Sequence, residues 1–267
     1  MAFPDIPKKA PHWGAFFVLA ICLGEPALAA CPTSASGERV QVARVVDGDT
    51  VKLADGRNVR LIGVNAPELA HNGRTTEPFA EAARQRLQAL VAANDGELAL
   101  QPGRQPKDRY GRTLAHLYDR QGQNIEAQLL AEGLGYLVAI APNTELTACQ
   151  KVAEREAREA GRGLWKRSPV QDAQSLRASG FAVVRGQVAE VQRNRGGLWI
   201  ELDGPLVLRI GPDLLKSFDK RTLDKLPGRS LEARGWVIDR AAKGGVKPGQ
   251  ARWVLPITDS AMLELLP

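Results

Sequence analysis

The fold is decided by residues 42–64, which read VARVVDGDTVKLADGRNVRLIGV. On either side of the Asp-Gly-Asp run, valine alternates with polar residues, which is typical of short strands. Asp55-Gly56 is a hairpin signal that leads into a third strand at 59–64. This third run is apolar at nearly every position after Arg60, as expected of a strand buried on both sides in a closed barrel.

The chain beyond this stretch divides into a helix-containing part and a second β-rich part. Two more strands and three helices predict that 38–167 folds as a barrel of α+β, mainly β, type. The polar, proline-containing residues 168–180 are predicted to be a linker, and 181–260 show the strand and helix order of an OB-fold. The expected elements are helices at 79–93, 124–133, 143–161 and 213–218, and strands at 97–100, 113–118, 181–192, 197–202, 206–210, 230–239 and 252–257.

The composition indicates a folded, basic protein. Its 267 residues suffice for one large domain or two modest ones, and 44% are hydrophobic, which excludes disorder for most of the chain. The formal net charge is +6. This excess suits nucleic acid or an anionic membrane surface as a partner, and it also suits a surface that only aids solubility.

The first thirty residues have the pattern of an export signal. Lys8 and Lys9 precede an apolar run at 15–23, which is too short to span a bilayer. Ala27 and Ala29 have the spacing that a signal peptidase accepts. We therefore expect residues 1–30 to be removed and the remaining protein to be periplasmic or secreted.

Cys31 has two interpretations. Leu28-Ala29-Ala30-Cys31 reads as a lipobox, which would anchor the protein to a membrane through a lipid, but Glu25 and Pro26 interrupt the apolar run before it. In an oxidising compartment Cys31 and Cys149 would remain as a pair after signal removal. A disulfide between them is the favoured alternative.

Three polar clusters carry candidate chemistry. They are Asp47-Gly48-Asp49-Thr50, then Arg60 with Asn65-Ala66-Pro67-Glu68, then Asp108-Arg109-Tyr110-Gly111-Arg112. Taken singly each is a weak signal, because an Asp-Gly-Asp run is more often a turn than a metal site. Together, in this order and spacing, they resemble the thermonuclease (micrococcal or staphylococcal nuclease-like) family over about residues 42–165.

The resemblance implies an OB-type five-stranded barrel with three helices and a metal-dependent phosphodiesterase that cleaves DNA and RNA with little selectivity. In that family's pattern Glu68 would act as the general base on water or position it, a role that suits a carboxylate. Arg60 and Arg112 would grip phosphate oxygens and stabilise the transition state. Arg109 and Tyr110 are predicted substrate contacts.

The same resemblance implies a calcium site. Asp49, the Asn65 amide and the Ala66 carbonyl would supply the hard oxygen ligands that Ca²⁺ prefers. Asn65 stands where the family usually has a second aspartate, and an amide brings no charge, so weaker cation binding is expected. Residues 138–141, Val-Ala-Ile-Ala, stand where relatives can carry tyrosines that stack on the nucleotide. Stacking is therefore expected to be weaker or to come from elsewhere.

The second β-rich part adds basic and aromatic residues. Arg193 and Arg195 lie in its predicted first hairpin loop, among Trp199, Trp236 and Trp253. On an OB-fold such residues bind single strands by charge and stacking. The alternative is that at least two of the tryptophans fill the core.

Two functions remain open. The favoured one is an exported, calcium-dependent endonuclease, expected to be a monomer without an obligate protein partner. The competing one is a catalytically weak or inactive nucleic-acid-binding protein on the same fold. Retention of Arg60, Glu68 and Arg112 together favours the enzyme, because a binding protein has no need of a carboxylate beside phosphate. Only His71 and His116 would remain beside two cysteines, so no zinc cluster is expected.

Overall fold

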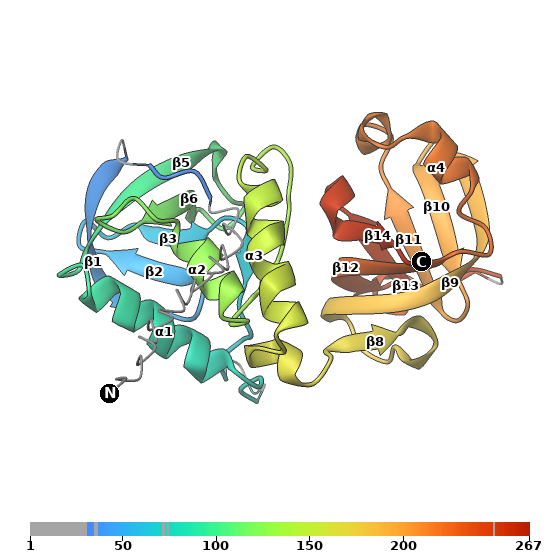
Figure 1. The fold of residues 1–267 in the computed structure, drawn as a ribbon. Coiled ribbons are helices and arrows are strands. Elements are labelled where there is room, and N and C mark those ends of the chain that lie inside the picture. The colour runs from blue at the N-terminus through green and yellow to red at the C-terminus, as the bar shows by residue number, and fades with distance from the viewer. Residues whose placement is uncertain (1–30, 35–36, 71–72, 74, 248) are drawn as a thin grey trace, which may run out of the picture.

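The computed structural model describes residues 31–34, 37–70, 73, 75–247 and 249–267. The predicted export signal at 1–30 and His71 lie outside these residues. Two β-structures follow one another along the chain, with helix α3 of the first facing the second (Figure 1). Within the described part, no helix is both long and apolar enough to cross a membrane.

The first structure is a closed five-stranded barrel with the pairing order β1-β2-β3-β6-β5. β3 and β6 are parallel, and the other neighbours, including the β1–β5 pair that closes the barrel, are antiparallel. This confirms the predicted OB-type barrel. Its strands are β1 (Glu38–Val45), β2 (Thr50–Leu53), β3 (Asn58–Leu61), β5 (Glu97–Lys107) and β6 (Thr113–Tyr118).

Three helices pack around this barrel: α1 (Ala80–Ala92), α2 (Ile125–Ala131) and α3 (Thr147–Glu159). The Asn124 side chain caps α2 as predicted, by accepting the Ala127 N–H at 2.9 Å. α3 begins at Thr147, later than the predicted start at 143–144. The reason is that the Asn143 side chain bonds both backbone groups of Gln105, which fixes it to the edge of β5 instead of a helix terminus.

The predicted strand at 59–64 is broken in two, which corrects the sequence interpretation. β3 ends at Leu61, and β4 (Val64–Asn65) pairs instead with β7 (Tyr136–Leu137). Gly63 makes the break with φ +91°, and a Cβ there would lie 1.9 Å from the Gln150 side chain. The break turns the chain out of the barrel just before the candidate Pro-Glu loop.

The second structure repeats the pairing order of the first. Its strands form the circuit β9–β10–β11–β13–β12–β9, in which only β11 and β13 are parallel. A short helix, α4 (Lys220–Asp224), stands between the third and fourth strands, after the 3-10 turn η3 (Leu214–Ser217) that occupies the predicted helix at 213–218. The strands are β9 (Gly180–Asn194), β10 (Gly197–Leu202), β11 (Leu206–Ile210), β12 (Ser230–Asp239) and β13 (Trp253–Ile257).

Residues 168–180, predicted to be a linker, belong to this second structure. β8 (Val170–Asp172) pairs in parallel with β9, and Ala173 and Leu176 are buried in the second core. Only a few apolar residues mark this segment among polar ones, too few to distinguish a short edge strand from a loop. The remaining elements are η1 (Gly163–Lys166), η2 (Ala173–Ser175), η4 (Ala241–Lys243), η5 (Ser260–Met262) and β14 (Leu263–Leu265), which pairs with β12.

A buried ionic cluster joins the two structures. Arg234 on β12 bonds Glu154 on α3 and Glu232 beside it, and all three side chains are less than one-tenth exposed. Arg158 on α3 donates to both oxygens of Glu232. Glu154 also accepts the Leu137 N–H at 2.7 Å. The cluster therefore ties α3 and β7 of the first structure to β12 of the second.

Cys31 and Cys149 are joined by a disulfide, the pairing expected from the sequence. Cys149 lies in the first turn of α3, and the bond spans a sequence separation of 118 residues. It therefore encloses the whole first barrel in one covalent loop.

Removing this bond is expected to destabilise the protein. Cys149→Ser should lower the free energy of unfolding by about 2–4 kcal/mol, because the cross-link restricts the unfolded chain. Urea unfolding followed by circular dichroism measures the change, and the wild type in reductant should show the same loss. An unchanged midpoint in both samples would contradict the prediction.

Candidate active site

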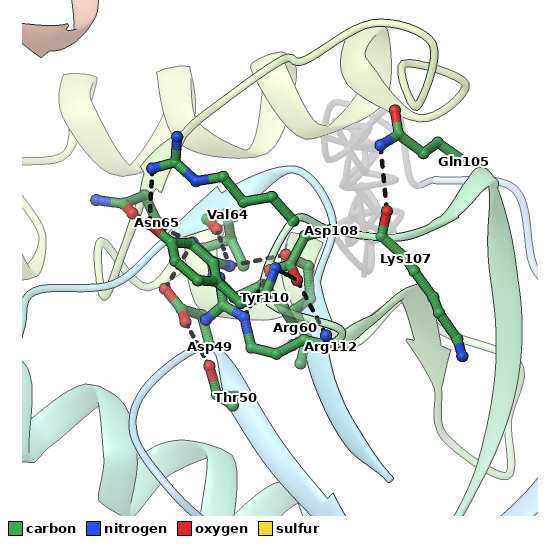
Figure 2. Close-up of polar contacts among 12 residues, drawn as sticks. Asp49, Thr50, Arg60, Val64, Asn65, Gln105, Lys107, Asp108, Tyr110 and Arg112 are labelled. Atoms are coloured by element: carbon green, nitrogen blue, oxygen red, sulfur yellow. Dashed lines mark hydrogen bonds and ion pairs between the residues drawn. The ribbon is translucent and has the colours of Figure 1, made fainter.

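Four segments of the first barrel carry the predicted catalytic and metal-binding residues, and Figure 2 shows Asp49, Arg60, Asn65 and Arg112 among them. They are the β1–β2 turn, β3, β4 with the loop after it, and the β5–β6 turn. Each segment is short, so its side chains are positioned by the strands that flank it. The result is a polar cluster built on a rigid scaffold.

The β1–β2 turn places Asp49 in the protein interior. Asp47 begins the turn by accepting the Asp49 N–H at 3.0 Å, and the buried Asp49 carboxylate accepts the Ala66 N–H at 2.7 Å. A Cβ on Gly48 would lie 2.6 Å from the methyl groups of Ala66 and Ala83. Only glycine allows this close approach, which explains the Asp-Gly-Asp sequence.

Arg60 is fixed by four protein oxygens. Its Nη1 donates to the carbonyls of Leu61 at 2.8 Å and Val64 at 2.7 Å. Its Nη2 donates to the Asn65 amide oxygen at 3.2 Å and lies 3.1 Å from the Asp49 carboxylate. The side chain is 13% exposed, so it is largely but not completely shielded from solvent. Arg60 therefore joins the predicted phosphate site to the predicted metal ligands.

The environment of Asp49 suits a cation. Burial raises the pKa of Asp49 to about 7; the Arg60 guanidinium opposes this shift and the Asp47 carboxylate adds to it. The nearby oxygens are carboxylate, amide and backbone carbonyl, a donor set that fits a hard divalent ion. No group of three or more His, Cys, Asp and Glu side chains in the described residues is arranged to hold a metal, so a cation here would depend partly on Asn65 and Ala66.

Glu68 lies in the loop after β4, where its carboxylate is exposed. Glu77 holds the loop, because its side chain accepts the Glu68 N–H at 3.0 Å and its N–H donates to the Glu68 carbonyl at 2.9 Å. Partial burial raises the pKa of Glu68, the Asp47 carboxylate adds to the rise, and Arg60 and Arg112 oppose it. Glu68 is thus within electrostatic range of both predicted catalytic arginines.

The β5–β6 turn presents Arg112, Arg109 and Tyr110. Asp108 shapes the turn by accepting the N–H groups of Tyr110 and Arg112, both at 2.9 Å, and the Arg112 Nε at 2.7 Å. Arg109 lies 4.8 Å from the centre of the Tyr110 ring and Arg112 lies 5.7 Å from it. The Tyr110 ring is 69% exposed, so the predicted substrate contacts form an open cationic and aromatic surface.

Arg193 and Arg195, the other predicted substrate contacts, lie apart from this cluster at the β9–β10 turn of the second structure. Among the described residues, neither contacts the candidate catalytic side chains. The nearby Trp199 is flanked by Arg209 at 5.5 Å and Arg240 at 5.2 Å. The role of Arg193 and Arg195 in substrate binding stays a prediction.

The tryptophans of the second structure have different environments. Trp253 is buried in the core, but Trp199 is only partly buried and Trp236 is 38% exposed, so one tryptophan fills the core instead of the two or more expected. Sequence reasoning did not single out Trp236 as a site residue. It lines a cavity of about 780 Å³ between the two structures, and Glu68 lines the same cavity.

Residues 138–141 divide into a buried pair, Val138 and Ala139, and an exposed pair, Ile140 and Ala141. Val138 and Ala139 are buried in the core of the second structure. The Ala139 N–H donates to the Met262 sulfur at 3.1 Å, and its carbonyl accepts the Thr258 hydroxyl at 2.6 Å. The first half of the apolar run that departs from the family pattern therefore packs between the two structures.

Comparisons with known proteins agree with this geometry. The family model described as "Staphylococcal nuclease homologue" matches residues 58–167. A thermonuclease from Staphylococcus intermedius is 33% identical over 138 residues, which cover 51% of this chain and 80% of that relative. A thermonuclease from Staphylococcus hyicus is 29% identical over 136 residues, covering 50% and 79%. An uncharacterized endonuclease from Escherichia coli O157:H7 is 29% identical over 128 residues, covering 47% and 75%. The chain therefore belongs to the staphylococcal nuclease homologue, or thermonuclease, family.

Proposed function

We propose that this protein is an exported endonuclease that hydrolyses phosphodiester bonds in DNA and RNA with the help of Ca²⁺. The observation that carries the proposal is that the Glu68 carboxylate lies within electrostatic range of the guanidinium groups of Arg60 and Arg112. The relatives named as nucleases support a hydrolytic nuclease. Their substrates imply nucleic acid as the partner, and the basic charge of +6 suits a polyanion.

The side chains divide the reaction among them. Glu68 accepts a proton from water, or positions it, as the water oxygen attacks phosphorus. Arg60 and Arg112 donate hydrogen bonds to the phosphate oxygens, whose negative charge increases as the bond to the leaving oxygen breaks. The exposed Tyr110 and Arg109 contact the nucleotide beside the scissile phosphate. None of these proposed contacts depends on the identity of the base or on the 2′-hydroxyl of the sugar, which supports low selectivity between sequences and between DNA and RNA.

Asp49, the Asn65 amide and the Ala66 carbonyl would hold the cation. When bound, it would supply charge that neutralises the phosphate. The ion pair between Arg60 and Asp49 occupies part of this donor set at 3.1 Å. A cation would therefore compete with Arg60 for Asp49, which supports a modest affinity.

The disulfide between Cys31 and Cys149 supports export, because such bonds persist in oxidising compartments. Together with the signal pattern at 1–30, it favours a periplasmic or secreted protein. A lipid at Cys31 would require that the bond be absent.

The proposed function is tested by incubating the purified protein with plasmid DNA and with RNA, in millimolar calcium or in chelator. The expected result is cleavage of both substrates in calcium and none in chelator. Retained nucleic-acid binding without cleavage at any calcium concentration would overturn the proposal in favour of a binding protein.

Asn65→Asp is expected to tighten cation binding. The substitution adds a carboxylate to the donor set, so the calcium concentration for half-maximal cleavage should fall by about tenfold or more. Isothermal titration with calcium measures the same change without substrate. Gln85→Glu is the matched control, because it adds the same charge on the exposed face of α1. An equal effect of both substitutions would contradict the prediction.

A further inference from the structure

A row of aromatic rings leads from the candidate active site across the cavity between the two structures. The ring of Tyr136 lies 5.1 Å from that of Phe181, which lies 5.3 Å from that of Trp236. Tyr136 pairs with Asn65 in the β4–β7 ladder, so the row begins beside the candidate active site. All three rings line the cavity, and the row ends on an exposed indole.

Two basic side chains share this cavity. Lys166 and Arg167 are adjacent, exposed and part of the cavity lining, as is Glu68. Neither forms an ion pair with any of the described residues. Cations without a carboxylate partner beside exposed aromatic rings are suited to a strand that carries both phosphates and bases.

Packing between the two structures does not account for Trp236. The buried ionic cluster and the contacts of Ala139 already join them, and 38% of Trp236 remains exposed. Residues 138–141 offer no aromatic ring for stacking: Val138 and Ala139 are buried in the second core, and the exposed Ile140 and Ala141 are aliphatic. The aromatic residues that share a cavity with Glu68 are therefore Tyr136, Phe181 and Trp236.

We propose that this cavity is a binding subsite for single-stranded nucleic acid. Bases stack on Trp236 and Phe181, while Lys166 and Arg167 contact the phosphates next to the scissile bond. The volume of about 780 Å³ accommodates nucleotide-sized groups. Stacking accepts any base but requires an unpaired one, so the subsite favours single strands over duplexes. This inference deepens the proposed nuclease function and rests on it.

The test compares a single strand of about twelve nucleotides, long enough to reach the cavity, with a dinucleotide that occupies only the reacting centre. Trp236→Ala should lower kcat/KM on the longer strand by about tenfold more than on the dinucleotide. Trp236→Phe, which keeps an aromatic face, should retain most of the wild-type kcat/KM on the longer strand. Phe218→Ala, which removes a partly buried aromatic ring outside the cavity lining, should change kcat/KM on neither substrate.

The basic pair has a matched control of identical composition. Lys166→Ala with Arg167→Ala should weaken binding of the longer strand and reduce its dependence on salt. Lys220→Ala with Arg221→Ala removes an exposed Lys-Arg pair on α4, outside the cavity, and should do neither. Equal losses on both substrates, or equal losses in cavity and control variants, would overturn the proposal.

Binding separates this proposal from the nuclease function. In the Glu68→Gln background, fluorescence anisotropy of a labelled single strand should show about tenfold weaker binding when Trp236 is also replaced by alanine. Unchanged binding would overturn the subsite even if the wild type cleaves. Weakened binding in a protein whose wild type never cleaves would retain the subsite and refute the nuclease.

Discussion

Glu68→Gln is expected to lower kcat for cleavage of DNA and RNA by about 10²–10⁴-fold, the usual contribution of a positioned general base. The amide keeps the size of the side chain but cannot accept a proton from water. Glu68 lies within electrostatic range of both Arg60 and Arg112, which suits it to act on a water beside a phosphate that they bind. Initial rates on a fluorogenic oligonucleotide at saturating calcium measure the loss.

The fold should survive this substitution, because the Glu68 side chain is exposed and the loop is held through its backbone by Glu77. The unfolding midpoint of the variant is therefore expected to match that of the wild type. Glu190→Gln, an exposed carboxylate on β9, is the matched control and should retain full activity. If the two variants kept comparable rates, Glu68 would not be the base.

Arg234→Met is expected to lower the free energy of unfolding by about 3–5 kcal/mol, because breaking a buried pair leaves uncompensated buried charge. Arg234 is 7% exposed and contacts both Glu154 and Glu232, which are also buried. Methionine fills similar space. Glu232 would keep its ion pairs with Arg158 and Arg185, but Glu154 would lose Arg234, the cation that the ion pairs of this cluster give it. Urea unfolding measures the loss.

Arg185→Met provides the comparison, since Arg185 approaches the same Glu232 at 3.7 Å but is 54% exposed. Its loss should be about 0–1 kcal/mol, as for other exposed pairs. Equal losses for the two variants would show that burial does not decide the effect.

The same cluster predicts sensitivity to acid. Burial alone would raise the pKa of Glu232, but hydrogen bonding and charge from Arg158, with Arg234 and Arg185, hold it below 4.5. Because the pKa of Glu232 is lower in the folded state than in the unfolded chain, its contribution to the free energy of unfolding is complete at pH values above the unfolded-state pKa. That contribution is lost as the pH falls below 4.5 toward the folded-state pKa.

The strand pattern of the sequence predicted much of the barrel, and the resemblance to the thermonuclease family implied the grouping of Arg60, Glu68 and Arg112. The alternation of valines marked β1 and β2, and the hairpin glycine placed β3 beside them. The end of β3 before Gly63 could not be predicted from the local sequence, because the positive φ of Gly63 and its close approach to Gln150 depend on a helix almost ninety residues later.

The cavity and the ionic cluster were beyond sequence reasoning for a related reason. Tyr136, Phe181 and Trp236 are far apart in the chain, and no local period connects them. Val138 and Ala139 show the same limit, because their apolar character is explained only by the second core that surrounds them in the folded protein.

The covalent loop between Cys31 and Cys149 gives protease nicks different outcomes in the two halves. A single cut between these residues leaves both fragments attached, so the nicked protein migrates as one species on a non-reducing gel. A cut after Cys149, such as one in the loops of the second barrel, frees the downstream fragment under denaturing conditions without any reductant. A nick in the half that carries the candidate catalytic side chains would thus leave that half in one piece, whereas a nick in the second half would divide the protein.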